Sequence, residues 1–391
     1  MPAPHHPTPP QTTPPQTTPL HLTPRRPFAP EALDNCAAAL ATGSLSSING
    51  RFTAEFETGF AALHGARHGI ATSSGTAAIH TAIAALDLPP GTEVVLPPIT
   101  DAGSVTPLLV QGLVPVFCDV DDHLAMTPEA IEAVITPRTG AIMVVHLFGG
   151  VSDVRAIRAL ADIHGLKLVE DCAQAHATQL GESHVGTFGD IGMFSLQQSK
   201  HLTSGDGGLC LTNDDDLAAR MRLFRDKGWD RSATGARSYP VLGLNYRITE
   251  LQSAVAVAGL PGLPGVVARR RQAAARLDAA LSTVPGITTW SPPPAAEASY
   301  WCYPFFVPAA LRDEFGRRLL EAGVPVTPGY IGAPIFECLV ATADIHAPVP
   351  HTRDALSRLI VFWLHEHHTD DDLDAVAGAI GAIVRDLEGQ A

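Results

Sequence analysis

The sequence predicts an α/β fold with a mainly parallel central sheet, followed by a smaller α+β part toward the C-terminus. From about residue 30, short apolar runs alternate with segments of helical periodicity, as in sheets whose parallel strands are connected by helices. After about residue 265, strands and helices follow one another in a mixed α+β order. The chain has 391 residues, 46% of them hydrophobic, which is enough for two globular parts with a sizeable core.

Seven apolar runs are predicted to form the strands of the large sheet. They are residues 68–72, 93–97, 114–120, 140–147, 166–171, 191–196 and 207–213. The helices predicted in the same region are 31–42, 52–64, 76–86, 103–111, 127–135, 152–164 and 214–227, with a further helix within 245–260. Because parallel strands are buried on both faces, we expect helices on both sides of this sheet.

Three regions are expected along the chain. Residues 1–29 are crowded with Pro, Thr and Gln and lack the apolar core of a signal peptide, which predicts a disordered extension that the chemistry does not need. Residues 30–264 are predicted to form a large domain and residues 265–391 a small C-terminal domain, joined by an Arg/Ala-rich helix within 261–285. The small domain should hold strands near 300–307, 324–328 and 359–363 and helices at 309–322 and 370–387.

Charge and cysteine usage narrow the class of function. The net charge is −14, with 40 acidic against 26 basic residues, which argues against a nucleic-acid partner and favours small-molecule substrates. No uninterrupted apolar run reaches the roughly 18 residues of a membrane span, so we expect no membrane segment. Six cysteines without CxxC spacing predict free thiols in a reducing cytoplasm.

Two segments follow predicted strands and carry polar side chains. In "TSSGTAAIH" (72–80), small residues open a helix whose free N–H groups and dipole would bind a phosphate; the alternative is a plain N-cap by Ser74 or Thr76. In "LVEDCAQAHAT" (168–178), Asp171 stands at the carboxyl end of a strand, where ligands of open α/β sheets bind; the alternative is a carboxylate that caps the next turn.

Two further segments stand out by composition. In "SLQQSKHLTSGDGG" (195–208), Lys200 is followed by glycines that permit a close backbone approach, although most loop lysines are simply solvated. In "GLNYRITELQSA" (243–254), the structural interpretation is a helix start capped by Thr249, with Asn245 and Arg247 in local hydrogen bonds.

Together, a phosphate cradle, an acid at a strand end and a lysine in a glycine-bounded loop match what a protein must supply to pyridoxal 5'-phosphate (PLP). That cofactor requires a Schiff-base lysine, an anion beside its ring nitrogen and anchors for its phosphate. The order along the chain, cradle then acid then lysine, also suits an aminotransferase-like domain.

The motifs "SSGTAAIH", "EDCAQAHAT", "GDIGMFSLQQSKHLTSGDGG" and "LNYRITELQSA" occur in this order and resemble those of the DegT/DnrJ/StrS sugar aminotransferases. The resemblance runs from about residue 30 to the C-terminus and is densest at 70–260. It implies PLP as the cofactor, pyridoxamine 5'-phosphate as its form between the two half-reactions, and the fold of aspartate aminotransferase (fold type I).

The resemblance also implies a role for each matching residue. Lys200 would bind the cofactor covalently and then move a proton between substrate and cofactor, and Asp171 would pair with the ring nitrogen. Gln174 would contact the cofactor near its phenolic oxygen. Ser195 would bind the phosphate together with the backbone of Gly75 and Thr76.

Further implied roles concern the partner subunit and the choice of reaction. Asn245 matches a residue that reaches the phosphate bound by the neighbouring subunit, which implies a homodimer with shared active sites. Some relatives are sugar dehydratases with a histidine at the lysine position; here the run "TSGDGG" fixes Lys200 in that register and makes His201 its neighbour. His201 and Tyr330, together with the loop 229–242, are the candidate substrate contacts.

Three places depart from the family pattern. Asp101 stands among the cofactor-binding positions where relatives commonly have an aromatic residue that stacks on the pyridine ring; a carboxylate cannot stack, and its alternative role is an N-cap. Trp363 stands where proline is usual. His365, His367 and His368 resemble a metal cluster by composition only, without acidic or cysteine partners at ligand spacing, so we predict no metal site.

The sequence thus predicts a PLP-dependent aminotransferase that moves an amino group from L-glutamate or L-glutamine to a ketone on a sugar or cyclitol. The residues of the motif "QQSK…TSGDGG" favour the branch of this family that aminates keto-cyclitols or keto-sugars in antibiotic-type secondary metabolism. Two alternatives stay open: a PLP-dependent lyase, dehydratase or epimerase on a sugar-like substrate, and a non-catalytic PLP-binding regulator.

Overall fold

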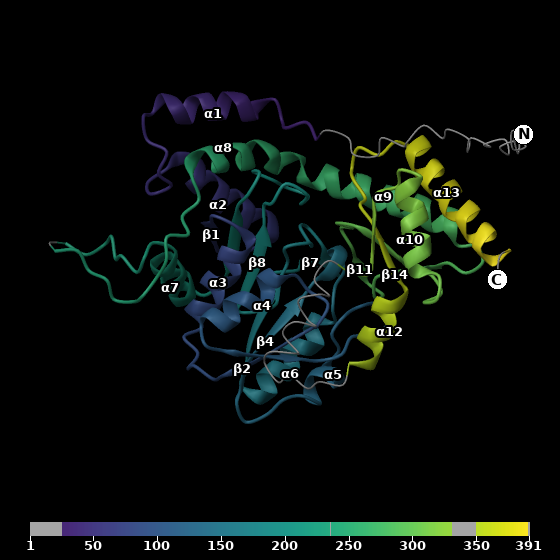
Figure 1. The fold of residues 1–391 in the computed structure, drawn as a ribbon. Coiled ribbons are helices and arrows are strands. Elements are labelled where there is room, and N and C mark those ends of the chain that lie inside the picture. Colours follow the sequence, from purple (N-terminus) through teal and green to yellow (C-terminus); the bar gives the residue numbers. More distant parts are fainter. Residues whose placement is uncertain (1–25, 235, 331–348, 390–391) are drawn as a thin grey trace, which may run out of the picture.

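The computed structural model describes residues 26–234, 236–330 and 349–389. A seven-stranded sheet forms its centre, in the order β1-β9-β8-β5-β4-β2-β3 (Figure 1). The strands are β1 (His68–Thr72), β2 (Glu93–Leu96), β3 (Val114–Phe117), β4 (Thr139–Val145), β5 (Lys167–Asp171), β8 (Ile191–Ser195) and β9 (Gly208–Thr212). All seven correspond to predicted strands. β9 runs antiparallel to both of its neighbours and every other pairing is parallel, so the predicted mainly parallel sheet is confirmed.

Helices cover both faces of this sheet, because its strands are apolar on both sides. The helices are α1 (Glu31–Ala41), α2 (Arg51–His64), α3 (Gly75–Ala85), α4 (Ala102–Val110), α5 (Pro128–Glu132), α6 (Val154–His164), α7 (Asp215–Arg225) and α8 (Glu250–Gly259). One face packs against α2, α6 and α8, and the other against α3, α4 and α7. In Figure 1, α1 lies alongside α8 at the edge of the molecule, and the two helices are in contact.

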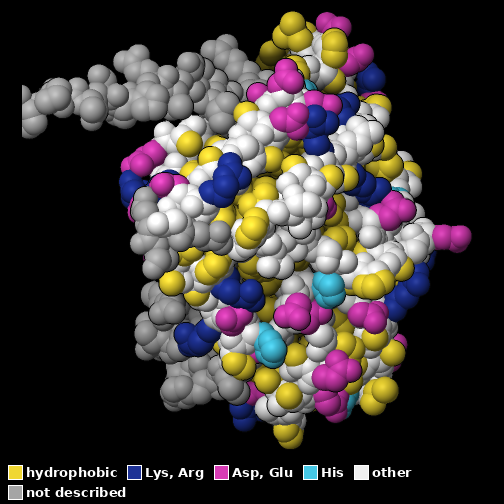
Figure 2. Space-filling model, turned by 90° about the vertical axis from the view of Figure 1, so that its right-hand side faces the viewer, with side chains coloured by type: hydrophobic (Ala, Val, Ile, Leu, Met, Phe, Trp, Pro, Cys, Tyr) yellow, Lys and Arg dark blue, Asp and Glu magenta, His cyan; other side chains and the backbone are white. Residues whose placement is uncertain are grey.

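The C-terminal part has its own sheet and its own apolar core. The strands β10 (Thr288–Thr289), β12 (Tyr303–Phe306), β14 (Leu359–Phe362) and β13 (Val326–Pro328) form an antiparallel sheet in that order. It packs against α9 (Leu263–Leu281), α10 (Arg312–Glu321) and α13 (Asp370–Glu388), while α12 (Pro350–Arg358) leads into β14. On the face that carries these elements, acidic and basic side chains are interspersed (Figure 2). The domain boundary at residue 264 stays a prediction.

The sequence did not predict several short elements. They are β6 (Gln179–Leu180), β7 (Ser183–His184) and β11 (Ala296–Glu297), which form a small three-stranded sheet, the two-residue strand β10, the helix α12, and the 3₁₀ turns η1 (Leu147–Gly149) and η2 (Leu260–Gly262). A strand of two residues is too short to show a hydrophobic period, so only its partner reveals it.

The structure can be compared with three other predictions, on the Thr249 cap, the cysteines and the N-terminal extension. The predicted cap Thr249 begins α8 with a complete capping box. Five of the six cysteines are free in the described residues; Cys338 lies outside them. Of the predicted extension 1–29, only residues 26–29 are described. Arg26 in this segment forms an ion pair with Glu366. For Arg26, the prediction of disorder is therefore wrong.

One stretch of the described residues, Glu250–Leu281, is long and apolar enough by composition to cross a membrane. It comprises α8, η2 and α9 and packs against α1, α2 and α13. Such runs also occur as core helices, so the expectation of no membrane segment stays a prediction.

The carboxylate of Glu170, at the end of β5, fixes the loop that leads into β8. It is fully buried and accepts hydrogen bonds from the backbone N–H groups of Gly186 (2.8 Å), Phe188 (2.8 Å) and Gly189 (2.7 Å). His146 Nε2 lies 3.0 Å from the same carboxylate. One side chain therefore satisfies three backbone donors, one buried and two partly buried, beside the sheet edge that carries Asp171.

We predict that Glu170→Ala lowers the free energy of unfolding by about 3 kcal/mol or more, because each buried donor left without a partner costs about 1–3 kcal/mol. Urea denaturation followed by circular dichroism measures this loss. Glu182→Ala, at an exposed position nearby, is the control and should leave stability unchanged. Equal midpoints for Glu170→Ala and the unaltered protein would contradict the role given to Glu170.

Candidate active site

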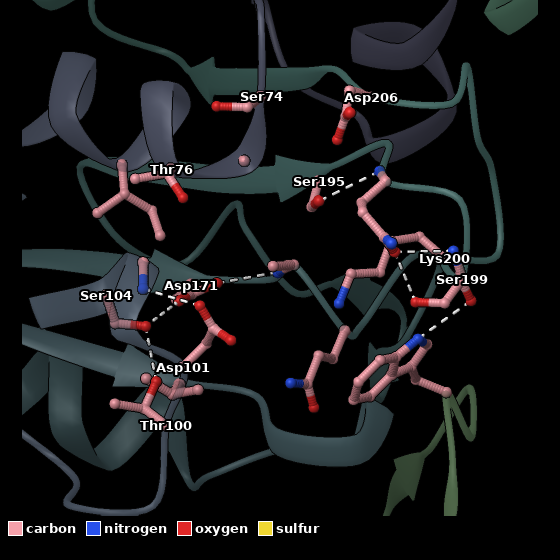
Figure 3. A pocket seen from close by; sticks show the side chains of 18 of the residues that line it. Ser74, Thr76, Thr100, Asp101, Ser104, Asp171, Ser195, Ser199, Lys200 and Asp206 are labelled. Carbon is pink, nitrogen blue, oxygen red and sulfur yellow. Dashed lines mark hydrogen bonds between the residues drawn. The ribbon is translucent and has the colours of Figure 1, made fainter. Parts of the chain in front are cut away.

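A cavity of about 360 Å³ opens at the carboxyl ends of the parallel strands, where ligands of open α/β sheets bind. Its walls come from the start of α3, the turn before α4, the end of β5 and the loop after β8. Lys200 and Asp171 reach into it from opposite sides (Figure 3). Two indoles from the C-terminal part, Trp301 and Trp363, close it.

The amine of Lys200 is almost fully buried in this cavity, at 9% exposure. Its Nζ lies 3.9 Å from the centroid of the Trp301 ring, and the indole N–H of Trp301 donates to the carbonyl of Ser199 at 3.1 Å. Burial lowers the pKa of Lys200 from 10.5 to about 8, although Cys302, Asp171 and Asp101 oppose that shift. About one tenth of this amine is therefore neutral, and so nucleophilic, at pH 7, against a far smaller fraction at its ordinary pKa.

Asp171 lies at the end of β5 and is buried. One oxygen accepts from the hydroxyl of Ser104 at 2.7 Å and the other from the backbone N–H of Ala173 at 3.0 Å. Burial raises the pKa of Asp171, and these donors together with Lys200 offset the rise only in part. A cationic N–H brought to this carboxylate would relieve the cost of its burial, which is what a protonated pyridine nitrogen offers.

The start of α3 forms a cradle with the end of β8. Ser74 is the N-cap and accepts from Ala77 N at 3.0 Å, as the structural interpretation predicted, while the first N–H groups of a helix have no partner within the helix. A Cβ on Gly75 would lie 2.7 Å from the Cβ of Ser195, and a Cβ on Gly208 would lie 2.2 Å from the carbonyl of Ser74. Only glycine fits at these positions, which leaves N–H groups and the Ser195 hydroxyl at the cavity wall. This donor set fits a phosphate.

Gln174 links the cavity to the C-terminal part of the chain. Its side-chain oxygen accepts from Phe148 N at 2.8 Å, and its amide donates to the Tyr330 hydroxyl at 2.8 Å. Tyr330 is buried and packs edge-on against Phe148. The structure thus brings the predicted residue Tyr330 to a predicted cofactor residue, and it does so through a hydrogen bond that no local pattern contains.

Asp101 has both of the positions considered from the sequence, in the cavity and at a helix N-cap. It is the N-cap of α4, accepting from Gly103 N at 2.8 Å, and it also lines the cavity. It provides no ring surface there. The aromatic surface of the cavity comes instead from Trp301 and Trp363, whose rings meet at right angles with centroids 5.3 Å apart. The sequence singled out Trp363 only as a departure and did not single out Trp301.

Among the described residues, three of the predicted site residues do not line this cavity: His201, Asn245 and Tyr330, the last of which is joined to the cavity wall only through Gln174. His201, a candidate substrate contact, is 1% exposed, lies 3.1 Å by Nε2 from the carbonyl of Ser299 and packs beside His176. That prediction is corrected: the side chain points into the protein and cannot meet a substrate there. Asn245 is exposed, pairs with Asp226 in an isolated β-bridge after α7, and is not among the residues that line the cavity. The loop 229–242 lies between these two residues in the chain; its Gly235 lies outside the described residues.

The histidines near the C-terminus have an acidic neighbour after all. His365, Glu366 and His367 offer ligand atoms within 4.8 Å of one another, which corrects the expectation that no acid stands at ligand spacing. The Glu366 carboxylate is, however, ion-paired with Arg270 at 2.7 Å and with Arg26 at 3.1 Å. It already has its counter-charges, and we propose no metal there.

The fold and the site together define the class of protein: an enzyme with a buried active-site lysine and the architecture of the aminotransferases. The model of the DegT/DnrJ/EryC1/StrS aminotransferase family matches residues 28–381, and the chain belongs to this family of aminotransferases. The family implies PLP as the cofactor, and the residues of the cavity fit that group, as the glycine-lined cradle shows.

Individual relatives agree with this assignment. The chain is 40% identical over 294 residues, 70% of its own length and 68% of the relative's, to an L-glutamine:2-deoxy-scyllo-inosose aminotransferase of Streptomyces kanamyceticus. It is 43% identical over 232 residues, 59% of its own length and 62% of the relative's, to a UDP-N-acetyl-3-dehydro-alpha-D-glucosamine 3-aminotransferase of Acidithiobacillus ferrooxidans. Among solved structures, the aminotransferase TlmJ from Streptoalloteichus hindustanus superposes with a TM-score of 0.85 at 32% identity, covering 92% of this chain and 99% of that one.

We predict that covalent attachment of Lys200 to PLP in the cofactor-free protein speeds up about tenfold per pH unit below pH 8 and levels off above it, because only the neutral amine reacts and its pKa is about 8. Borohydride trapping followed by mass spectrometry of the digest measures the rate. The chain has three lysines, so the digest must show the label on Lys200 and not on the exposed Lys167 or Lys227. A rate for Lys200 that keeps rising steeply above pH 8 would contradict a depressed pKa.

Proposed function

We propose that this enzyme transfers an amino group from L-glutamine or L-glutamate to the ketone of a cyclitol or sugar, with PLP as the cofactor. The observation that carries this proposal is the convergence of Lys200, Asp171 and the cradle at Gly75 and Ser195 on one cavity. When bound, PLP supplies an aldehyde that exchanges amines and a ring that accepts electrons.

In this proposal Lys200 holds the cofactor covalently and then acts as base and acid at the substrate carbon. A pKa of about 8 lets the same amine give up and take back a proton near neutral pH. Its position over Trp301 and its burial limit the access of water to the proton that it carries.

Asp171 has the complementary task of keeping a proton on the nitrogen that faces it. The hydrogen bonds from Ser104 and Ala173 orient the carboxylate and favour its charged form. Ser195, with the N–H groups of Gly75 and Thr76, binds the phosphate. Gln174 contacts the cofactor and is oriented by its hydrogen bonds with Phe148 N and the Tyr330 hydroxyl.

The name shared by several relatives supports the choice of amino donor and acceptor. Enzymes named L-glutamine:2-deoxy-scyllo-inosose aminotransferase match from Streptomyces kanamyceticus, Streptomyces fradiae and Micromonospora echinospora, at 36–40% identity. These names favour L-glutamine as the donor and a keto-cyclitol as the acceptor, with a keto-sugar as the second choice. The polar side chains of Asp101, Gln197 and Asp206 in the cavity wall suit a polyhydroxylated acceptor. We assign the enzyme to antibiotic-type secondary metabolism on the same ground.

We further propose a homodimer in which each subunit completes the other's site. The segment between α7 and α8 projects from the body and exposes apolar side chains, among them Tyr239 (52% exposed) and Leu242 (95% exposed). Asn245, which lies in this segment, would meet the phosphate bound by the partner subunit. A cytoplasmic location belongs to this proposal, since the described cysteines are free thiols.

Absorbance spectroscopy tests the function directly. Purified protein supplied with PLP should show a visible band that Lys200→Ala abolishes, because no other amine lines the cavity in the described part of the chain. L-glutamine should convert the band to that of the pyridoxamine form, and a keto-cyclitol should restore it. Absence of any band would rule out the cofactor. A band that no amino donor changes would favour the lyase, dehydratase or epimerase alternative if substrate is still consumed, and the regulator alternative if it is not.

A separate test concerns Asp171. We predict that Asp171→Asn still binds PLP through Lys200 but reacts with L-glutamine about 10²–10³-fold more slowly, the usual loss when one aligned electrostatic group of an active site is removed. Stopped-flow absorbance of the donor half-reaction measures the rate. Asp122→Asn, at an exposed position, is the control. An unchanged rate in Asp171→Asn would remove Asp171 from the mechanism.

A further inference from the structure

We propose that Arg26 is a positioning residue for Lys200, so that the short segment before α1 is part of the active-site architecture. This inference rests on the proposed function in one respect, the role of Lys200 as the cofactor lysine. The guanidinium of Arg26 donates to the backbone carbonyls of Lys200 and His201. In the part of the chain that the structure describes, it is the only donor to these two oxygens.

The same guanidinium is anchored by a buried acid. Nη2 of Arg26 lies 3.1 Å from Glu366 Oε1, and the side chains are 10% and 1% exposed. Arg270 binds the other oxygen of Glu366, with Nε at 2.9 Å and Nη2 at 2.7 Å. Burial raises the pKa of Glu366, but Arg270 and Arg26 more than offset that rise and lower it to about 2, so the carboxylate stays charged.

Arg270 carries the network to the other neighbour of the lysine. Its Nη1 donates to the carbonyls of Trp301 at 2.7 Å and Leu364 at 3.1 Å. Trp301 is the residue on whose ring the Lys200 amine lies. One buried network of two arginines and one glutamate therefore holds the backbone of Lys200 and the backbone of the indole beneath its amine in a fixed relation.

Arginine is the residue type that this arrangement requires. A planar guanidinium can meet two adjacent carbonyls and a carboxylate at once, whereas a lysine ammonium is a point charge on a flexible stem. With Arg26 absent, two carbonyl oxygens of the lysine loop would lose their donor and Glu366 would lose one of its two counter-charges.

The test uses the full-length protein, four variants that probe Arg26 and one control variant. We expect Arg26→Ala to raise the dissociation constant for PLP about 10-fold or more, the range for losing hydrogen bonds to a charged group, and Arg26→Lys to recover only part of that loss. In the cofactor-free protein, hydrogen exchange of the amides of residues 196–204 should be faster in Arg26→Ala. A deletion of residues 2–25, which keeps Arg26, should bind PLP as the full chain does, and a deletion of residues 2–26 should behave like Arg26→Ala.

Arg276→Ala is the matched control, since Arg276 forms ion pairs with Asp370 and Asp374 on the surface of the C-terminal part. It should leave PLP affinity and exchange at 196–204 unchanged. The inference is overturned if Arg26→Ala shows normal PLP affinity and normal exchange, whatever its thermal midpoint, or if the two deletions are equally defective. Failure of the unaltered protein to bind PLP would instead overturn the proposed function, while the exchange comparison would still report on Arg26.

Discussion

The burial of one amine is the constraint on which the rest of this structure depends. Lys200 lies at 9% exposure over an indole, and its desolvation lowers its pKa to about 8. An ammonium group is costly in such a place unless the surroundings are fixed in advance. The sheet, the glycine-lined cradle and the tryptophans of the C-terminal part can each be understood as holding that amine opposite Asp171 in a cavity of about 360 Å³.

The parallel sheet contributes by bringing distant segments to one edge. Asp171 ends β5 and Ser195 ends β8, and these strands are neighbours in the sheet. Asp101 and Ser104, at the start of α4, follow β2, which lies two strands from β5 in the sheet. Because the carboxyl ends of parallel strands face the same way, residues more than 90 positions apart in the chain line one cavity without any long loop.

The C-terminal part closes this edge of the sheet. Trp301 and Trp363 supply aromatic surface where Asp101 cannot, and Tyr330 is held through Gln174. The buried Arg26–Glu366–Arg270 network joins the beginning of the described chain, the lysine loop and the C-terminal part.

The sequence by itself determined the sheet, the order of its strands along the chain and the motif residues, because buried strands, helix caps and glycine-bounded loops leave local patterns of spacing. All seven strands of the large sheet and the caps at Ser74, Asp101 and Thr249 were predictable in this way. Only the tertiary structure decided that His201, next to Lys200, does not face the cavity. It buried His201 against a backbone carbonyl and turned Lys200 inward, and it placed Trp301 and Arg26 beside that lysine from 101 and 174 residues away. These contacts join segments that are far apart in the sequence. Because the hydrophobic periodicity within one segment carries no information about the other, neither segment alone predicts them.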